Sequence, residues 1–192
     1  MYKNFFKRLI DFIIAFCALS VIWPILLAVT VWLHFANKGA GAFFFQERPG
    51  KDGKIFKVIK FKTMTDERDS EGKLLPDAQR LTKVGKFVRS TSIDELPQLI
   101  NILMGDMTIV GPRPERPEIA EQYLGELPEF HLRLQAKAGL TGYAQVYGKY
   151  NTTPYDKLKL DLTYIENYSV WMDIKLMLLL SLLAILFTEF SK

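Results

Sequence analysis

The chain has 192 residues, of which 49% are hydrophobic and 24% charged, and its formal net charge at pH 7 is +4. This length supports one hydrophobic core with an appended membrane element. The modest positive charge suits anionic membrane surfaces or phosphorylated substrates as well as nucleic acid. The single cysteine, Cys17, excludes a disulfide framework and a thiolate metal site, and only His34 and His131 are present for histidine chemistry.

Residues 9–35 are apolar enough to enter a bilayer, where a spanning helix needs about 20 apolar residues. Pro24 lies at the centre of this run, where it removes one backbone hydrogen bond and clashes with the carbonyl group of Ser20. Both ends of the run are basic, which by the positive-inside rule places both on the cytoplasmic side. The flanking basic residues are Lys3, Lys7, Arg8, Lys38, Arg48, Lys51 and Lys54. The residues alone leave three alternatives open: a kinked spanning helix, an uncleaved signal anchor, and a re-entrant helix that breaks at Pro24.

Two β-rich runs, AFFFQER and KIFKVIKFKTM, follow from Ala42, and the turn-rich connector PGKDG between them predicts a hairpin. Lys60 and Lys62 then fall on one face by period two. Residues 66–80 are highly charged and contain Gly72 and Pro76, which predicts a mobile surface loop, and one use of such a loop is a lid.

An Asp-Glu pair follows in a segment that reads as a helix start. Ser92 and Glu95 have the S-x-x-E spacing of a capping box, and Pro97 is tolerated only in a first turn. We therefore expect a helix from about Ile93 to Glu95 onward, with Asp94 at or beside its cap. The helix is expected to end at Gly105 and to bury one apolar face, made of Leu96, Leu99, Ile100, Ile102 and Leu103. The carboxylates are explained equally by an ordinary helix start and by groups pre-positioned for chemistry.

The prolines at positions 112, 114 and 117 force an extended path that holds Arg113 and Arg116 on a stiff segment. Residues 117–125 predict a short helix, and 139–143 a turn leading into a short apolar run. A further helix is expected from Tyr155, with Leu158, Leu162 and Ile165 at helical spacing. Residues 171–187 are strongly apolar, and the residues alone leave two alternatives open: a span, for which the run is short, or a position in or on the membrane interface.

Basic residues around an Asp-Glu pair on a membrane-anchored chain suit phosphoryl transfer, which needs charge neutralisation, usually with Mg²⁺, and a positioned nucleophile. The basic residues in question are Lys60, Lys62, Arg89, Arg113 and Arg116. The common phosphate-binding signatures G-x-x-x-x-G-K-[ST] and G-x-G-x-x-G are absent from the sequence.

Five ordered motifs resemble those of the bacterial sugar transferases, the monotopic phosphoglycosyl transferases, over residues 3–185. They are Phe61-Lys62-Thr63-Met64, Asp94-Glu95-Leu96-Pro97-Gln98, Gly105-Asp106-Met107, Val110-Gly111-Pro112-Arg113-Pro114 and Gly139-Leu140-Thr141-Gly142. The resemblance implies an α+β fold, with a small β-hairpin or sheet packed with several helices and with amphipathic interfacial helices. It implies a re-entrant helix-break-helix over residues 1–37 and a catalytic domain over 38–192, with an interfacial helix at about 171–188. The domain would lie on the cytoplasmic face of the bacterial inner membrane.

The resemblance also implies a reaction: transfer of a sugar-1-phosphate from a UDP-sugar to a polyprenyl phosphate, usually undecaprenyl phosphate, with release of UMP. This is the first membrane step of glycoconjugate or polysaccharide assembly. Asp94 matches the family's nucleophile, which forms a covalent phosphosugar intermediate and binds Mg²⁺, and Glu95 matches the second acid. The positions expected to bind phosphate are Lys62, Arg89 and Arg113, to which we add Arg116.

Three residues depart from the family pattern. Trp23 stands where serine often precedes the breaking proline, Ala138 where proline often precedes G-[LI]-T-G, and Lys149 where arginine often follows glycine. Two other functions remain to be distinguished: a glycosyltransferase that moves the sugar alone and releases UDP, and a membrane adaptor without activity. Nucleic-acid binding is disfavoured because acidic residues interrupt the basic ones. The sequence leaves open the donor sugar, the glycan pathway and the oligomeric state.

Overall fold

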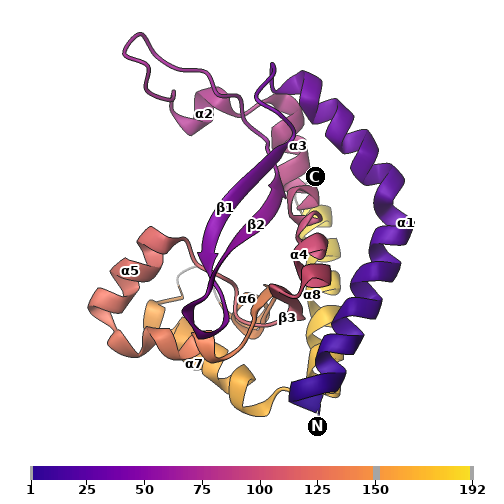
Figure 1. Ribbon diagram of the computed structural model, residues 1–192, viewed down its shortest axis with the longest axis vertical. Helices are drawn as coiled ribbons and strands as arrows, with labels where there is room; N and C mark the ends of the chain where they lie inside the picture. The colour runs from indigo at the N-terminus through magenta and orange to yellow at the C-terminus, as the bar shows by residue number, and fades with distance from the viewer. Residues whose placement is uncertain (1, 149–151, 191–192) are drawn as a thin grey trace. The chain divides into compact units, whose positions relative to one another are not determined.

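The structure, a computed structural model, describes residues 2–148 and 152–190, with the side chains of Asn4 and of residues 181–190 left aside. It has the α+β composition that we predicted, with helices and two separate two-stranded sheets (Figure 1). The elements are a π-helix η1 (Tyr2–Phe6), α1 (Lys7–Ala36), β1 (Phe43–Pro49), a 3-10 helix η2 (Lys51–Gly53), β2 (Ile55–Phe61), α2 (Asp77–Arg80), α3 (Lys83–Ser90), a 3-10 helix η3 (Ile93–Glu95), α4 (Gln98–Met104), β3 (Met107–Val110), α5 (Pro117–Glu126), a 3-10 helix η4 (Pro128–Gln135), β4 (Ala138–Thr141), α6 (Tyr143–Tyr147), α7 (Pro154–Asn167) and α8 (Val170–Phe190).

Residue contacts divide the chain into two compact units, and several elements run from one to the other. The first unit combines Met1–Ile14, Glu47–Lys57 and Ile102–Lys192. The second unit combines Ala15–Gln46 and Val58–Asn101. The carboxylate pair belongs to the second unit, and the proline-rich arginine segment belongs to the first.

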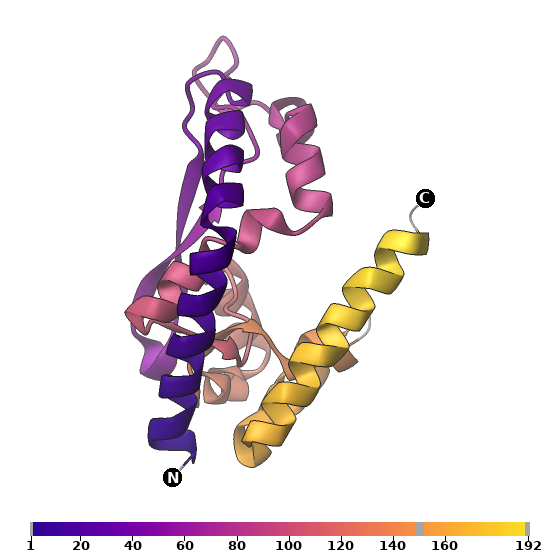
Figure 2. The ribbon, with the colours of Figure 1, turned by 90° about the vertical axis from the view of Figure 1, so that its right-hand side faces the viewer.

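Helix α1 is continuous over 30 residues with Pro24 inside it, and Figure 2 shows it as one helix along its whole length. The interruption that we predicted at Pro24 is therefore not seen. A proline removes one backbone hydrogen bond, and the turns on either side of it keep theirs. The apolar side chains of α1 are largely exposed, with Val21 at 76%, Trp23 at 58% and Phe35 at 75%. Among the described residues, α1 alone is long and apolar enough to cross a membrane, with a mean hydropathy of 2.7 over its best window.

The predicted hairpin is confirmed. Strands β1 and β2 pair with each other, and the connector between them contains the short helix η2. Asp52 in that connector adopts a left-handed conformation with φ of 56°, which aspartate tolerates better than most residues. In β2, Phe56, Val58 and Phe61 are buried. The charged segment that we predicted as a surface loop is exposed from Asp66 to Leu74, and its proposed role as a lid stays a prediction.

The second unit has a core made of side chains from α1, β2, α3 and the residue that precedes β1. Its buried members are Val29, Leu33, Ala42, Phe61 and Val88. Helix α3 begins at the cap residue Thr82, whose hydroxyl group accepts a hydrogen bond from the amide of Gly85 at 2.9 Å. This cap fixes the first turn of α3, and Asp94 lies in η3, which follows the end of that helix.

In the first unit, β3 and β4 form a parallel pair in which Met107 lies opposite Ala138 and Val110 opposite Thr141. The sequence predicted a turn where β4 stands. The glycines of this segment serve close packing, because a Cβ added to Gly139 would lie 2.3 Å from the amide nitrogen and carbonyl oxygen of Gly111. The small core beneath this pair includes Val110, Tyr164 and Leu176.

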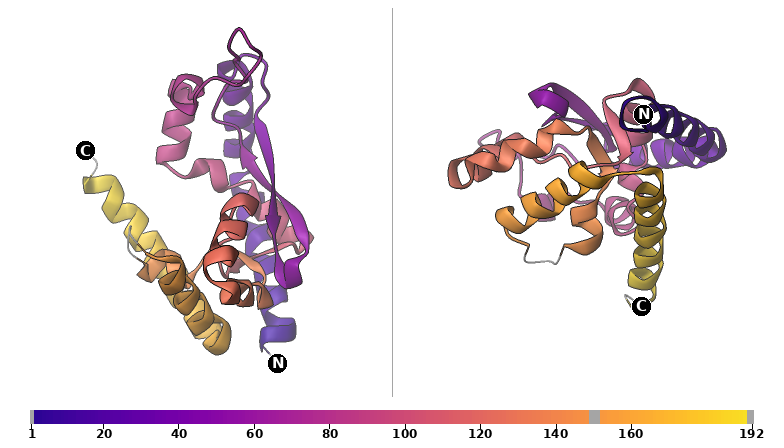
Figure 3. Two further views of the ribbon diagram at one scale, coloured as in Figure 1. Left: turned by 90° about the vertical axis from the view of Figure 1, so that its left-hand side faces the viewer. Right: turned by 90° about the horizontal axis from the view of Figure 1, so that it is seen from below.

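Helix α5 confirms the helix predicted for residues 117–125, and α7 confirms the one expected near Tyr155. Thr153 caps α7 by accepting a hydrogen bond from the amide of Asp156 at 3.1 Å. Figure 3 shows α8 leaving α7 at a bend. Helix α8 has 21 residues and is longer than the predicted apolar run. Its predicted place in the membrane interface stays a prediction. Lys149 lies outside the described residues.

Candidate active site

Asp94 and Glu95 lie in η3, which follows α3 through the left-handed residue Ser92, with φ of 55°. The predicted capping box does not form, since the Ser92 side chain makes no cap hydrogen bond and only its carbonyl oxygen accepts from the amide of Glu95, at 3.2 Å. The single predicted helix is divided into η3 and α4, because Pro97 has no N–H to continue a hydrogen-bonded ladder. The S-x-x-E spacing of Ser92 and Glu95 therefore does not make a capping box in this structure.

Glu95 is paired with a lysine of strand β2. The ammonium group of Lys60 lies 2.8 Å from Oε1 of Glu95, and the side chains are 20% and 21% exposed. A charge-assisted hydrogen bond of this length, mostly removed from solvent, holds both groups in position. Lys60 is the residue that our list of phosphate-binding positions left out, although it shares the period-two spacing of Lys62.

Asp94 lies partly buried beside this pair. Burial raises the pKa of its carboxyl group, and the negative charge of Glu95 raises it further, whereas Lys60 and Arg89 act in the opposite direction. Burial and a like charge both disfavour the ionised form of an acid. The carboxylate of Asp94 is thus more basic than an exposed aspartate and would gain from the approach of a cation.

The other predicted basic residues of the second unit differ in their surroundings. Arg89, in the last turn of α3, is exposed and acts electrostatically on Asp94. Lys62 lies just beyond the end of β2 and pairs with Asp66 at 2.5 Å. The structure thus associates Asp94 and Glu95 with Lys60 and Arg89, and it associates Lys62 with the charged loop.

Helix α4 buries polar as well as apolar side chains. Leu99 and Ile102 are buried as predicted, but Ile100 is 38% exposed, because the buried face also takes in Gln98 and Asn101. Oδ1 of Asn101 accepts a hydrogen bond from the amide of Ile59 in β2 at 2.9 Å, which fixes α4 to the hairpin. The predicted end at Gly105 is confirmed by its φ of +94°.

In the first unit, Arg113 and Arg116 lie on the proline-rich segment that leads into α5, with Arg113 partly buried and Arg116 exposed. A third arginine, Arg48 of β1, shares this region. Burial lowers the pKa of Arg48, and the positive charges of Arg116 and Arg113 lower it further, against the opposing effect of Glu115. The sequence analysis treated Arg48 only as a membrane-flanking residue, because the hairpin that carries it here is distant in sequence.

A buried ion pair supports the arginine segment. Arg133 is 4% exposed and Asp161 1%, and Nε of Arg133 donates to Oδ2 of Asp161 at 2.8 Å. Nη2 of Arg133 also donates to the carbonyl oxygen of Arg113 at 2.8 Å. Glu115 completes the network through Arg133 and through an ion pair with Lys157. The backbone of Arg113 is therefore fixed by a side chain that lies twenty residues further along the chain.

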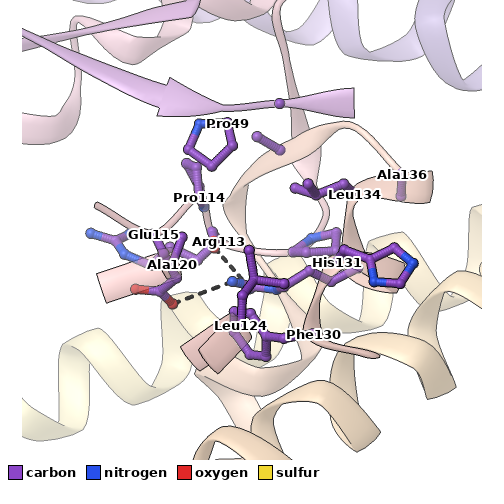
Figure 4. A pocket seen from close by; sticks show the side chains of 14 residues that line it. Pro49, Arg113, Pro114, Glu115, Ala120, Leu124, Phe130, His131, Leu134 and Ala136 are labelled. Atoms are coloured by element: carbon purple, nitrogen blue, oxygen red, sulfur yellow. Dashed lines mark hydrogen bonds and ion pairs between the residues drawn. The ribbon is translucent and has the colours of Figure 1, made fainter. Parts of the chain in front are cut away.

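Beside Arg113 lies a small, largely apolar cavity of about 70 Å³ (Figure 4). Pro114, Leu124, Phe130 and His131 are among the residues that line it. The two functional groups of residues thus occupy different units: the carboxylate pair with Lys60 in the second, and the arginine segment with this cavity in the first.

Comparison with known proteins identifies the family. The family model described as bacterial sugar transferase matches residues 2–187. The chain belongs to this family. It is therefore a transferase.

Three relatives show how much of the chain is shared. An uncharacterized sugar transferase, EpsL, of Bacillus subtilis (strain 168) is 44% identical over 176 residues, which cover 90% of this chain and 84% of that protein. The UDP-glucose:undecaprenyl-phosphate glucose-1-phosphate transferase of Klebsiella pneumoniae is 42% identical over 182 residues, which cover 91% of this chain but 39% of that protein. The protein of the same name from Caulobacter vibrioides (strain ATCC 19089 / CIP 103742 / CB 15) is 38% identical over 181 residues, covering 90% of this chain and 67% of its own length.

Family membership gives the motifs of this bacterial sugar transferase a structural context. Gly111 and Gly139 bring β3 and β4 together, so these motifs build the frame of the first unit. Ala138, where the family pattern often has proline, is the first residue of β4 and is 4% exposed. Trp23, the departure beside Pro24, is exposed on α1.

Whether the site fits Mg²⁺ depends on the carboxylate pair. Within the described residues, no group of three or more histidine, cysteine, aspartate or glutamate side chains is arranged so that it could hold a metal ion. Mg²⁺ in phosphoryl-transfer sites commonly binds one or two carboxylates and completes its shell with substrate phosphates and water. Asp94, partly buried beside a second carboxylate, fits that pattern.

Proposed function

We propose that this bacterial sugar transferase transfers a sugar-1-phosphate from a UDP-sugar to a polyprenyl phosphate, undecaprenyl phosphate in particular, and releases UMP. The observation that carries the proposal is the Asp94–Glu95 pair, in which a basic, partly buried carboxylate lies beside a second one fixed by Lys60. The names of relatives from Klebsiella and Caulobacter, which specify a UDP-sugar and undecaprenyl phosphate, support the same substrates.

The reaction would take place in two steps. In the first, a carboxylate oxygen of Asp94 attacks the β-phosphorus of the UDP-sugar. The bond between that phosphorus and the oxygen bridging to the α-phosphate breaks, and UMP leaves with the bridging oxygen. The product is an acyl phosphate in which Asp94 carries the sugar-1-phosphate. A carboxylate nucleophile divides one difficult transfer into two easier ones.

In the second step, a phosphate oxygen of the polyprenyl phosphate attacks the same phosphorus, and the Asp94 carboxylate leaves. The product is a polyprenyl diphosphate sugar, and the enzyme is regenerated. We assign to Glu95 the removal of a proton from the acceptor phosphate or its positioning, because Lys60 holds the Glu95 carboxylate in one place.

The phosphate groups of donor and acceptor need positive charge around them. We assign this role to Arg89, Lys62, Arg113 and Arg116, and we add Lys60 as a positioning residue. Mg²⁺, bound by Asp94 and by the diphosphate of the donor, would neutralise the charge that develops on the phosphate oxygens.

We also propose that α1, whose helix continues through Pro24, bends at that proline and enters and leaves the bacterial inner membrane on the cytoplasmic side, as a re-entrant helix. The exposed apolar surface of α1 supports its contact with lipid. A lipid phosphate lies at the level of the headgroups, so a nucleophile that meets it must work at that depth. The apolar helix α8 would then lie in the interface.

Nucleotide release tests the reaction. Purified full-length protein would be supplied with Mg²⁺, undecaprenyl phosphate and a panel of UDP-sugars, and the released nucleotide identified. UMP released with one sugar, and not by Asp94→Asn, is the expected result, and Asp69→Asn in the exposed loop is the matched control. Release of UDP would identify ordinary glycosyl transfer, and no release with any donor would favour the adaptor.

The covalent intermediate can be tested separately. Without the acceptor, wild-type protein incubated with the correct donor should gain the mass of one sugar phosphate, and Asp94→Asn should not. A mass gain on a different residue would contradict the role given to Asp94. No mass gain during rapid UMP release would contradict the two-step reaction.

The path of α1 can be tested by labelling single cysteines at positions 3 and 38. Cys17 is exposed on α1 and must first be replaced by serine. Labelling of Lys3→Cys and Lys38→Cys from the same side of the membrane is expected for a re-entrant helix. Labelling from opposite sides would show that α1 spans the membrane.

A further inference from the structure

A second cavity of the first unit, of about 390 Å³, is lined by an unusual number of basic side chains. Five of its lining residues carry a positive charge: Lys3, Lys7, Arg8, Lys51 and Lys137. Asp11 is its one lining carboxylate, and that group already accepts hydrogen bonds from the hydroxyl of Thr108 at 2.5 Å and from the amide of Ile109 at 3.2 Å. The lining therefore carries a clear excess of positive charge.

Some of these cations have a structural role. Arg8 donates to the carbonyl oxygens of Ile102 and Leu103 at the end of α4, and Lys137 donates to that of Gly105 at 2.8 Å. Such contacts satisfy the free carbonyl groups of a helix end and oppose its negative dipole. These contacts use only some of the hydrogen-bond donors of Arg8 and Lys137, since a lysine ammonium group alone has three.

Lys7 forms an ion pair with Asp173 at 2.6 Å, and Lys3 donates to the carbonyl oxygens of Ile165 and Glu166, so the excess positive charge rests on the other cations of the cavity. Lys51 lies exposed at the cavity, and among the described residues its ammonium group pairs with no carboxylate. Burial lowers the pKa of Lys137, and the positive charges of Arg8 and Lys51 lower it further, against the opposing effect of Asp11 and Asp106. Like charges gathered at one cavity are costly unless an anion occupies it.

The size and position of the cavity indicate the anion. A water molecule takes about 30 Å³ of liquid volume, so 390 Å³ accommodates a phosphate group with part of its carrier. Lys3, Lys7 and Arg8 directly precede the apolar residues of α1. Basic residues at the end of a membrane-embedded helix lie among the lipid headgroups, where they attract anionic phosphates.

We propose that this basic cavity, lined by Lys3, Lys7, Arg8, Lys51 and Lys137, binds the phosphate group of an anionic membrane lipid. The site belongs entirely to the first unit, and the proposal does not depend on the reaction assigned to Asp94. An anionic phospholipid and a polyprenyl phosphate present the same chemistry to it, and direct binding measurements distinguish the two.

The test compares two lysines of the same connector. Lys51 lines the cavity and Lys54, three residues later, does not, and both are exposed. Lys51→Gln and Lys54→Gln therefore remove the same charge from the same surface. Purified full-length protein in neutral detergent would be titrated with phosphatidylglycerol, phosphatidylcholine, undecaprenyl phosphate and inorganic phosphate, with bound lipid counted by native mass spectrometry.

We expect an anionic lipid to bind wild-type protein and Lys54→Gln equally, and Lys51→Gln about fivefold more weakly, the factor that corresponds to about 1 kcal/mol for one basic residue near lipid. Lys51→Gln should keep the wild-type melting temperature in the absence of lipid. Preference for phosphatidylglycerol would identify a phospholipid as the source, and preference for undecaprenyl phosphate would identify the acceptor lipid.

Two results would overturn the proposal. Equal weakening by Lys51→Gln and Lys54→Gln, or none by either, would show that the cavity holds no lipid phosphate and that only general surface charge attracts lipid. Inorganic phosphate binding as tightly as any lipid would show a site for free anions. Phosphatidylcholine, whose choline group the lysines repel, should bind weakly to every variant.

Discussion

The ammonium group of Lys60 lies 2.8 Å from Oε1 of Glu95, so strand β2 supplies the cation that faces the carboxylate pair. This relationship connects two residues 35 positions apart and fixes the orientation of the second acid. It also places positive charge near Asp94, where it opposes the rise in the pKa of that group.

Replacing Lys60 by glutamine should lower the rate of UMP release at least roughly tenfold, which corresponds to about 1.4 kcal/mol in the barrier. The substitution removes the ion pair that positions Glu95, so kcat should fall more than the affinity for donor. Lys60→Arg should recover part of the activity because it restores the charge. The control is Lys57→Gln on the exposed side of β2, and equal effects at both positions would contradict a specific role for Lys60.

Asp94→Asn should abolish activity without lowering stability. Ionising the Asp94 carboxyl group is disfavoured by burial and by Glu95, so a neutral amide of similar shape removes an unfavourable charge from the folded protein. The melting temperature in detergent should therefore equal or exceed that of the wild type. A fall of several degrees would mean that the Asp94 carboxylate stabilises the fold.

Gly139→Ala should destabilise the first unit, because the added methyl group would meet the backbone of Gly111 at 2.3 Å and force β3 and β4 apart. Overpacking of this kind costs about 1–3 kcal/mol or more. Gly125→Ala in α5 is the matched control, since no atom lies within 4 Å of its added Cβ and alanine favours the helix. Thermal unfolding of both variants checks the prediction, and equal melting temperatures would contradict it.

The sequence predicted those parts of the fold that local pattern decides. The hairpin follows from two β-rich runs around a glycine-rich connector, and α5 and α7 follow from helical spacing and proline at their starts. The parallel pairing of β3 with β4 was not predicted, because each strand has four residues and the partner lies about thirty positions away. Short strands of this kind acquire their conformation from tertiary contacts.

At the candidate site, the sequence analysis included Lys60 and Arg89 among the basic residues around the carboxylates, and the structure associates both with them. The positions expected to bind phosphate, however, included Lys62 and left out Lys60. Period-two spacing places Lys60 and Lys62 on one face only while the strand continues, and β2 ends at Phe61. Lys62 therefore pairs with Asp66 in the following loop. Ser92 likewise matched a capping box in sequence, but its left-handed backbone turns the hydroxyl group away from that role. Both differences depend on backbone geometry that residue spacing does not record.

Replacing Arg133 by methionine should cost about 3–5 kcal/mol of stability, because Asp161 would keep a buried charge without its partner. The double variant Arg133→Met/Asp161→Leu should recover much of this loss, since it removes both charges together. UMP release should remain low in the double variant, because the carbonyl oxygen of Arg113 has lost its donor. Recovery of stability and activity together would show that Arg133 does not position Arg113.

Replacing Glu115 by glutamine should lower the free energy of unfolding at neutral pH. The difference from the wild type should disappear in acid. Burial alone would raise the pKa of Glu115, but the charges of Lys157, Arg133 and Arg48 outweigh it and hold that pKa below its usual value of 4.5. The unfolded chain then binds the proton more readily than the folded one, so the stabilisation is complete above pH 4.5 and is lost as the pH falls through the lowered pKa.

The melting temperatures of wild type and Glu115→Gln, measured from pH 7 down to pH 3, test this linkage. Near neutral pH the wild type should be more stable by about 1–3 kcal/mol, the usual effect of leaving buried hydrogen-bonding groups without a partner. The difference should stay constant down to about pH 5 and narrow below it, because the protonated carboxyl group no longer attracts Lys157 and Arg133. Glu118→Gln, exposed in the first turn of α5, should show no such dependence. A difference that persists unchanged to pH 3 would mean that Glu115 stabilises the arginine segment by packing alone.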